Sequence, residues 1–427
     1  MLWDIKRYFM TQLASSHPIV RLGDYIKEES AKYNISDKAK TYGILGVNNH
    51  SGIFDAYEES GAKIKQKYKK MQVGWIAYNP YRVNVGSIGI RREEHHYEYI
   101  SPAYVVFSCK DGLMSEYLFL LMKTDLFNRI IRENTTGSVR QNLNYSILSN
   151  LQIPLPSLEE QNKIVAAYNA TIAQADNLSQ QAGDINDQIE EYLKETLGVE
   201  QNNTSSSKNT IGKFIWLVHL KNITRWDVYN SQDNNYNGTY DYLLLRDLLI
   251  SSPKYGAGYK AEKKRRDVRY IRITDINEDG SLNDDFASVA KYDNQYLLKQ
   301  NDFLIARTGN TVGKTFLYDE SIGKAIYAGY LIKFELDTNK VNPQYLLAYT
   351  KSSVYKTWIK NNMRISAQPN INSRQYEESP IIVPPLAIQN EIVDYILALR
   401  AEQKNLQQQA SDLRIQAQLQ FEQTIFQ

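Results

Sequence analysis

The stretch ARTGNTVGKTFL, from Ala306 to Leu317, has the glycines, lysine and threonine of a phosphate-binding loop. Such a loop needs four residues between its first glycine and the Gly-Lys-Thr, because that length wraps backbone N–H groups around the phosphates. Here only three residues separate Gly309 from Gly313. The β-branched and aromatic residues that follow favour a strand over a helix whose N-terminus would face the anion. The stretch therefore predicts two strands joined by a glycine turn, and not a nucleotide-hydrolysing site.

Two other short motifs bear on catalysis. Asn79-Pro80-Tyr81 approaches the Asn-Pro-Pro-aromatic motif of DNA amino-methyltransferases but lacks the second proline, and no Gly-rich cofactor loop accompanies it. The pair His95-His96 has acidic neighbours but no further Cys/His cluster, which favours a solvated segment over a metal site. No nucleophile and base stand in a recognisable spacing. The sequence thus predicts no catalytic residue, no metal site and no cofactor in this chain.

Basic side chains are concentrated in two stretches, although the net charge of the chain is only +2. Residues 62–92 carry eight Lys or Arg and no acidic residue, and residues 254–272 carry eight against two acidic residues. Tyr255, Tyr259 and Tyr270 lie within the second stretch. Such stretches can supply phosphate contacts and stacking surfaces for nucleic acid. A solvated lysine-rich face is the alternative for either stretch taken alone.

Length and composition indicate a globular protein of two or more domains, because 427 residues of ordinary apolar content can bury substantial cores. The single Cys109 excludes an internal disulfide and a Cys-rich zinc site, which favours a reducing compartment. There is no run of about 18 apolar residues, and the first residues do not read as a secretory signal. We therefore expect a cytoplasmic protein with no membrane partner.

The second half of the chain repeats the first. Setting Gln161 against Gln389 gives an offset of 228 residues. PLPSLEEQNKIV at 154–165 then falls on IVPPLAIQNEIV at 382–393. The chain is thus predicted to be two tandem copies of one unit.

Each copy has a segment rich in β-branched and aromatic residues, a proline-marked boundary and a long polar helix. Ser157 and Glu160 predict a capping box at the start of the first helix, and Pro384-Pro385 marks the second start. Apolar residues recur along both helices at a spacing typical of a coiled-coil seam. So narrow a seam favours pairing with the helix of the other copy over packing on the helix's own domain. Antiparallel pairing would hold the domains at opposite ends of a rod.

The predicted fold class is α+β, with two tandem domains of mixed α/β structure, each followed by a long helix, and with the two helices paired as an antiparallel coiled coil. The predicted boundaries are 1–155 for the first domain, 156–198 for the first long helix, 199–213 for a polar linker, 214–385 for the second domain and 386–427 for the second long helix. The linker lets the chain return so that the helices can pair.

These features together resemble the DNA-specificity subunits of Type I restriction-modification systems. The matching motifs are IPLPSLEEQNKIV (153–165), VPPLAIQNEIV (383–393), YIRITDI (270–276), DFLIARTGNTVGK (302–314) and SPKYGAGYKAEKK (252–264). The resemblance covers essentially the whole chain, and the order of the motifs is more specific than any one of them. It implies that each domain is a target-recognition domain for one half of a bipartite DNA sequence, while the helices fix the unread spacer.

The resemblance also implies partners for a non-catalytic subunit of a phage-defence complex. In the family, the helices dock two DNA methyltransferase subunits, to which two restriction and translocase subunits can be added. S-adenosylmethionine, and ATP with Mg if the complex restricts, would belong to those partners and not to this chain. The residues assigned to partner docking at the helix starts are Ser157, Glu160, Gln161, Pro385 and Gln389.

Candidate DNA contacts follow from the chemistry of readout. Sequence readout needs forked donors, such as Arg on guanine or Asn and Gln on adenine, together with neutralised phosphates. The candidates in the second domain are Tyr255, Lys260, Arg272, Arg307, Asn310, Lys314, Gln368 and Asn370. Those in the first domain are Asn48, Asn79, Arg82, Arg140, Gln141 and Asn142. For any one of them, an ordinary exposed polar residue or a turn-forming Asn is at least as good an explanation.

The two copies differ at informative positions. Asn79 lies near where the second copy has Arg307, so the two domains are expected to read different sequences. Ile388 stands where the first copy has Glu160, so the second helix is expected to lack the capping box.

Two alternatives remain open at the level of sequence. A related modification-cleavage enzyme could use a similar specificity chain with different partners. A coiled-coil protein scaffold would use the basic stretches for solubility only. Salt separates the scaffold from a DNA reader, because binding through several phosphates weakens steeply as salt rises.

Overall fold

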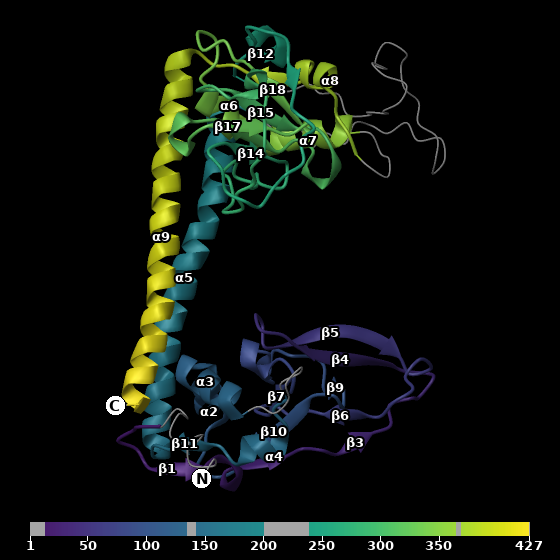
Figure 1. The fold of residues 1–427 in the computed structure, drawn as a ribbon, viewed down its shortest axis with the longest axis vertical. Coiled ribbons are helices and arrows are strands. Elements are labelled where there is room, and N and C mark those ends of the chain that lie inside the picture. Colours follow the sequence, from purple (N-terminus) through teal and green to yellow (C-terminus); the bar gives the residue numbers. More distant parts are fainter. Residues whose placement is uncertain (1–12, 135–141, 200–238, 364–368, 427) are drawn as a thin grey trace. The chain divides into compact units, whose positions relative to one another are not determined.

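The computed structural model describes residues 13–134, 142–199, 239–363 and 369–426. The chain divides into two compact units, one of residues 1–179 with 407–427 and one of residues 180–406. Each unit holds one mixed α/β domain and a part of both long helices, α5 (Leu158–Leu197) and α9 (Leu386–Phe426) (Figure 1). The expected α+β class, with a long helix after each domain, is confirmed.

The central sheet has four strands in the same order in both domains. In the first domain the order is β2 (Ile26–Glu28), β10 (Val105–Cys109), β7 (Ile76–Tyr78) and β8 (Ile88–Ile90). In the second it is β13 (Lys254–Tyr255), β18 (Leu331–Phe334), β15 (Phe303–Ala306) and β16 (Thr315–Leu317). All neighbouring strands in both sheets are antiparallel. This common order confirms the internal repeat.

A two-stranded antiparallel ribbon before each long helix also recurs. It joins β1 (Ile19–Arg21) to β11 (Gln152–Pro154) in the first domain and β12 (Tyr242–Leu244) to β19 (Pro380–Ile382) in the second. Pro154 and Ile382 are therefore equivalent, as the offset of the repeat requires.

The domains differ in their remaining strands. The first has a five-stranded sheet of β3 (Lys32–Tyr33), β6 (Tyr68–Lys70), β9 (Tyr99–Ile100), β4 (Thr41–Val47) and β5 (Ile53–Ser60). In the second, β14 (Arg269–Ile271) pairs in parallel with β17 (Ala325–Tyr327), as β4 does with β9. The first domain therefore adds strands to a common framework.

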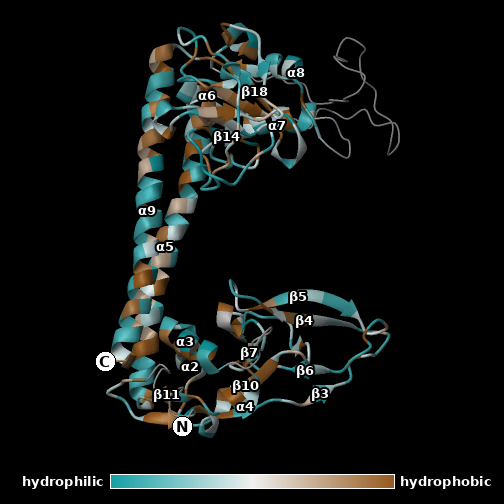
Figure 2. Ribbon diagram, in the orientation of Figure 1, coloured by the Kyte–Doolittle hydropathy of each residue, from teal (hydrophilic) through white to brown (hydrophobic). Residues whose placement is uncertain are grey.

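Helices cover the sheets and bury the two largest cores. They are α2 (Ser115–Lys123), α3 (Asp125–Asn134), α4 (Tyr145–Ser149), α6 (Pro343–Tyr349), α7 (Ser353–Asn362) and α8 (Ser373–Glu377). Single 3-10 turns are η1 (Leu22–Asp24), η2 (Val83–Val85), η4 (Leu245–Leu248), η5 (Asn294–Tyr296), η6 (Gly309–Thr311) and η7 (Glu320–Ile322). Figure 2 shows hydrophobic residues concentrated on the strands of the two central sheets and on the helices beside them.

The long helices pair antiparallel within each unit. In the first unit the ring of Tyr168 in α5 packs edge-on against Phe421 in α9, with centroids 6.1 Å apart. In the second, the amide Nε2 of Gln403 in α9 donates to the backbone O of Ala182 in α5 at 2.6 Å. Lower-numbered residues of α5 thus contact higher-numbered residues of α9, so the two helices run in opposite directions. Buried alanines at the seam, including Ala182, let the backbones approach closely enough for a glutamine to reach a carbonyl.

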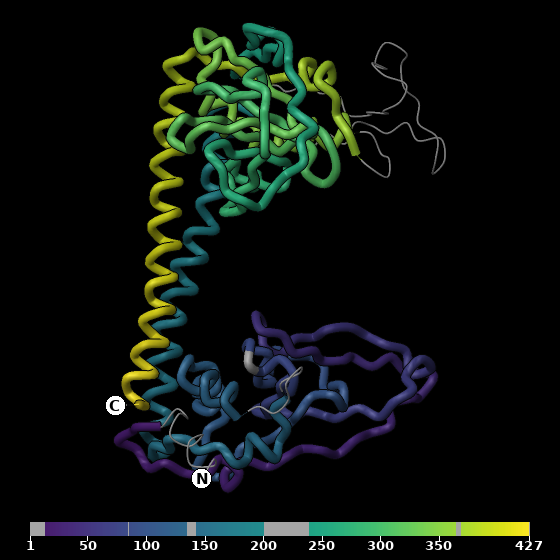
Figure 3. The backbone as a smooth tube through the Cα atoms, in the orientation of Figure 1, coloured from purple at the N-terminus to yellow at the C-terminus, as the bar shows by residue number. Residues whose placement is uncertain are grey.

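The last turns of each long helix pack into the domain of the other copy. Phe421 and Ile425, at the end of α9, belong to the core of the first domain, where Phe421 lies 6.0 Å from the ring of Tyr117. Figure 3 traces this end of the chain beside the first-unit helices. Ile189 and Leu193, at the end of α5, belong to the core of the second domain. A sequence repeat is therefore not a complete packing unit.

A carboxylate near the end of each long helix also contacts the domain of the other copy. Glu422 of α9 accepts a hydrogen bond from the backbone N–H of Asp125 at 3.1 Å, at the start of α3. Glu190 of α5 accepts from the N–H of Ser353 with both oxygens, at 3.0 and 3.1 Å, at the start of α7. An acceptor at a helix N-terminus satisfies a donor that has no partner within the helix.

Candidate nucleic-acid interface

The glycine-rich stretch of the second domain is a strand, a turn and a strand, as predicted. β15 and β16 pair with Phe303 opposite Leu317, and η6 lies at the turn. Gly309 and Gly313 have φ of 69° and 85°, which a side chain rarely adopts. A Cβ on Gly313 would also come within 2.8 Å of the Ile359 side chain. The glycines thus serve the turn and not a phosphate.

Three segments converge on this turn. The N–H of Arg307 donates to Tyr330 O at 3.0 Å, and the N–H of Ile371 donates to Arg307 O at 3.0 Å. The N–H of Gly309 donates to Pro369 O at 2.9 Å. The structure therefore brings the predicted residues Arg307 and Asn310, which share this turn, next to Asn370 from a later part of the chain.

Tyr255 joins the same surface from β13. The guanidinium carbon of Arg307 lies 4.9 Å from the centroid of the Tyr255 ring, within the range of a cation–π contact. The hydroxyl of Tyr255 accepts from the N–H of Ser373 at 3.1 Å. Tyr255 is 40% exposed and Tyr330 is 56% exposed. We call Tyr255, Arg307, Asn310, Tyr330 and Asn370 the Arg307 surface.

Tyr330 was missed by the sequence analysis. It follows Gly329 in the turn between β17 and β18, and an aromatic residue beside a glycine in a turn is the signal that could have found it. Periodicity gave no help, because the residue lies outside a strand.

Two other predicted residues of the second domain are committed to ion pairs. Arg272 makes a forked contact with Asp275, at 2.6 Å from Nη2 and 3.1 Å from Nε, and Asp275 is fully buried. This hydrogen bond raises the pKa of Arg272 above its usual value. Lys314 Nζ lies 2.8 Å from Glu278 Oε1 and also donates to Ile276 O at 3.3 Å. Both cations contact their own domain.

Lys260 is exposed in the basic stretch, where it is open to a phosphate contact. Gln368 of the second domain, and Arg140 and Gln141 of the first, lie outside the described residues.

In the first domain, two predicted asparagines shape turns. Asn48 Oδ1 accepts from the N–H groups of His50 at 2.8 Å and Ser51 at 2.6 Å, between β4 and β5. Asn79 Oδ1 accepts from the N–H of Tyr81 at 3.0 Å, after β7. Their side-chain oxygens thus have the turn-forming role that was the alternative to base contact.

These two turns lie beside each other, because Ser87 Oγ donates to Val47 O at 3.2 Å. Arg82 is exposed in the second turn, together with Tyr81 at 56% and Val85 at 59%, neither of which the sequence analysis selected. The Oδ1 atom of Asn142 is buried without a hydrogen-bond partner.

One hydrogen bond identifies which residues of the two turns are equivalent. Leu143 N–H donates to Pro80 O at 3.0 Å, just as Ile371 N–H donates to Arg307 O. Leu143 and Ile371 are equivalent in the repeat, so Pro80 occupies the place of Arg307. The first domain has no cation at this position.

The helix starts contain two different kinds of residue. Ser157 and Glu160 form the expected capping box, with Ser157 N 3.1 Å from Glu160 Oε2 and Glu160 N 3.3 Å from Ser157 Oγ. The hydrogen bonds from Ser157 lower the pKa of Glu160. Both residues, and Pro385 at the second start, are exposed.

Gln161 and Gln389 were assigned to partner docking, but their side chains form hydrogen bonds inside the protein. Gln161 Nε2 donates to Gly112 O and Pro156 O, both at 2.9 Å, and its Oε1 accepts from Met114 N–H at 2.8 Å. Gln389 makes the matching three bonds in its own unit. Both side chains are completely buried, so neither presents a surface to a partner. They lock each long helix to its domain.

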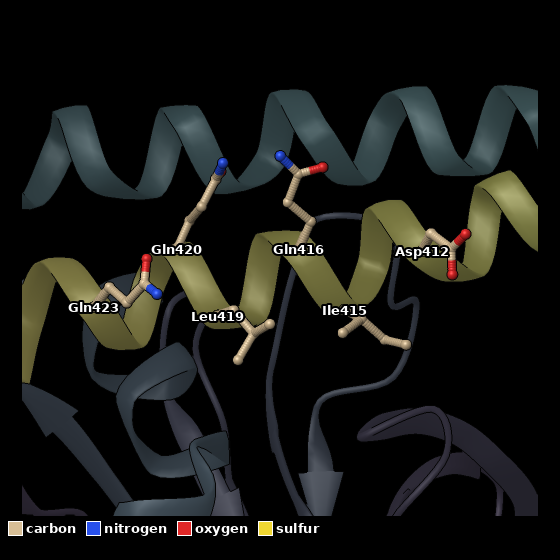
Figure 4. A pocket seen from close by; sticks show the side chains of 6 residues that line it. All are labelled: Asp412, Ile415, Gln416, Leu419, Gln420 and Gln423. Atoms are coloured by element: carbon tan, nitrogen blue, oxygen red, sulfur yellow. The ribbon is translucent and has the colours of Figure 1, made fainter.

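A groove with a volume of about 440 Å³ lies along the last turns of α9. It is lined by Asp412, Ile415, Gln416, Leu419, Gln420 and Gln423 (Figure 4). Ile415 and Leu419 are 57% and 52% exposed and point away from α5, whereas Gln416 and Gln420 point toward it. We call this stripe the α9 groove. The sequence analysis missed this groove because it considered only the apolar residues of α9 that were expected to face the other long helix.

Among the described residues, no group of three or more His, Cys, Asp or Glu side chains could hold a metal ion. The exposed His96 instead pairs with Asp55 at 3.0 Å. None of the helices in the described ranges is long and apolar enough to cross a membrane.

Residues 20–191 and 251–412 match the Type I restriction modification DNA specificity domain family. The chain belongs to this family. The specificity subunit of the Type I restriction enzyme EcoBI from Escherichia coli is 23% identical over 289 residues, which are 66% of this chain and 58% of that protein. The StySPI specificity subunit from Salmonella potsdam is 20% identical over 303 residues, 69% of this chain and 60% of that protein. The chain thus spans about 60% of the length of these relatives.

A subunit structure from a type I restriction-modification system has the same fold, with a TM-score of 0.61 at 14% identity over 97% of this chain and 98% of that one. The fold and the repeated family domain agree with the resemblance noted in the sequence. Members of the family are specificity subunits and are non-catalytic.

Proposed function

We propose that this chain is the DNA-reading subunit of a Type I restriction-modification complex and that each domain reads one half of a bipartite target. The observation that carries this proposal is the repeated sheet, which presents at the same edge of both domains a turn with exposed aromatic and polar side chains. In the second domain this turn carries the Arg307 surface. Forked cations and aromatic platforms are the chemistry that reads base edges and stacks on sugars and bases.

The proposal includes partners on the long helices. Two methyltransferase subunits would dock there, and restriction subunits would join them in the cytoplasm. S-adenosylmethionine, and ATP with Mg where the complex restricts, would bind those partners. The α9 groove supports a helical partner, because its residues recur at i, i+3, i+4 and i+7 and two of them are exposed apolar side chains.

Selection from a random pool of duplexes tests the function. The chain is co-expressed with the methyltransferase subunit of its own system, the complex is purified, and bound duplexes are sequenced at several salt concentrations. We expect a split motif with a fixed gap and affinity that falls steeply with salt. A single continuous motif would limit DNA reading to one domain. Absence of any enriched motif would favour the protein scaffold.

Co-purification tests the docking surface separately. Leu419→Glu places a charge in the α9 groove without touching the DNA-reading turns, so we expect loss of methyltransferase with the fold retained. Glu402→Gln, at an exposed position elsewhere on the same helix, is the matched control. Retention of the partner by both variants would place docking elsewhere.

A further inference from the structure

Arg307 is the cation of the Arg307 surface and, in the described part of the second domain, pairs with no carboxylate. Arg272 is held by Asp275 and Lys314 by Glu278, whereas the guanidinium of Arg307 contacts the Tyr255 ring. A cation that is stacked but not neutralised keeps its charge and its donors for a ligand. Arg307 is therefore the candidate whose donors remain available.

We propose that Arg307 reads a guanine in the half-site of the second domain and that Tyr255 positions its guanidinium for this contact. The inference rests on the proposed function and deepens it, because it names the base and the residue that sets the specificity.

The guanidinium is held from the backbone outward. Arg307 is hydrogen-bonded through both its N–H, to Tyr330 O, and its carbonyl, from Ile371 N–H. These bonds fix the Cα position between two other segments. The side chain then has one platform, Tyr255, whose own strand pairs with β18 at Ile332 and whose hydroxyl is tied to the start of α8 at Ser373. A forked donor held in this way loses little freedom when it binds.

The donor pattern selects guanine. Arg307 Nε is buried and has no hydrogen-bond partner among the described residues. Burial keeps this atom from a DNA base, so the two terminal NH2 groups remain to form a fork. Guanine offers two adjacent acceptors in the major groove, N7 and O6, which match that fork, whereas adenine places an NH2 donor beside N7. Cytosine and thymine offer no such pair.

The reading belongs to one half-site only. Pro80 occupies the equivalent place in the first domain, and its side chain has no donor. A substitution of Arg307 should therefore alter only the half-site of the second domain and leave the first half-site unchanged.

The test is random-pool selection with the purified methyltransferase complex, comparing the wild-type chain with Arg307→Ala, Arg307→Lys, Tyr255→Phe and Tyr255→Leu. For the wild type we expect a required G·C pair at one position of one half-site. Arg307→Ala should reduce discrimination at that position by roughly ten- to hundredfold and leave the rest of the motif unchanged. Arg307→Lys should also relax it, because an ammonium lacks the rigid fork.

The tyrosine variants separate positioning from general stability. Tyr255→Phe keeps the ring beneath Arg307 and should keep the preference for guanine. Tyr255→Leu removes the ring and should relax the same position, with Tyr255→Thr as a second ring-free variant suited to a strand if the leucine protein does not fold. Thermal melting of each variant identifies those that fold. Full preference for guanine in a folded ring-free variant would remove Tyr255 from the proposal.

Other outcomes overturn the base contact itself. Equal weakening on all sequences by Arg307→Ala, with a shallower salt dependence, would make Arg307 a phosphate contact. Relaxation at an adenine or pyrimidine would remove guanine as the base that is read. These results differ from failure of the proposed function, in which the wild-type complex itself selects no split motif.

Discussion

At the residue scale, the same side-chain type serves different purposes according to its neighbours. Arg272 and Arg307 both lie in motifs from which the sequence analysis selected candidate DNA contacts. A fully buried carboxylate beside Arg272 makes it part of the domain, and an aromatic ring beside Arg307 leaves its charge available. Asp275 lies in the same motif as Arg272, so its burial in the fold decides the first case, whereas the Tyr255 ring that contacts Arg307 comes from another motif.

Arg272→Ala should lower the free energy of unfolding of the second unit by about 1–3 kcal/mol, because it leaves the buried Asp275 without its forked donor. Arg307→Ala, which removes no ion pair, should change it by less than about 0.5 kcal/mol. Denaturant titration of both variants measures the difference. Equal stability of the two proteins would mean that the Arg272 pair contributes nothing.

Lys351 should make the stability of the second unit depend on pH. Its Nζ donates to Thr315 O at 3.0 Å and to Thr315 Oγ1 at 2.9 Å. Burial lowers the pKa of Lys351 to about 7, although the nearby carboxylates of Asp279 and Glu278 act to raise it. Between pH 7 and the ordinary lysine pKa, the unfolded chain binds a proton that the folded chain does not. Stability from this group therefore rises with pH across that window and is constant below it.

Lys351→Met should abolish this part of the rise. The measurement is denaturant unfolding from pH 6 to pH 10 for both proteins, with the slopes compared between pH 7 and pH 10. Parallel slopes would contradict a depressed lysine pKa in the folded state.

At the scale of elements, the long helices are parts of the domains as well as connectors. The starts of α5 and α9 are locked to their own domains by Gln161 and Gln389, and their ends fill the core of the other domain. Residues close together on one helix can thus differ greatly in function.

Phe421 and Leu419 make this difference testable. Phe421 is 3% exposed in the core of the first domain, whereas Leu419 is 52% exposed in the α9 groove. Phe421→Ala should destabilise the first unit by about 3–5 kcal/mol. Leu419→Ala, two residues away, should leave stability within about 0.5 kcal/mol. Hydrogen exchange in the strands of the first domain is the readout, and equal protection in the two variants would show that α9 does not complete that core.

At the scale of the whole molecule, the proposed function assigns the long helices the role of setting the unread spacer. A seven-residue insertion in each helix, after Ser179 in α5 and after Leu406 in α9, falls at the division between the two units. It adds about 10 Å of helix, close to the rise of three base pairs. We expect the selected motif to gain about three base pairs of spacer with both half-sites unchanged. An unchanged spacer would exclude the helices as its determinant.

Local patterns in the sequence determined the larger features of this protein. Repetition of order identified two copies, apolar periodicity identified two long helices, and the Ser157–Glu160 spacing identified a helix start, because these signals come from residues close together in the chain. The glycine-rich stretch from Ala306 to Leu317 was also predicted as two strands joined by a turn. Tertiary structure decided which candidates have free donors. The partners of Lys314 and Arg307 lie on other segments, and the burial of Asp275 beside Arg272 is set by packing. It also decided that Gln161 and Gln389 are internal and that Tyr330 and the α9 groove are exposed, because exposure depends on what the rest of the chain places against a residue.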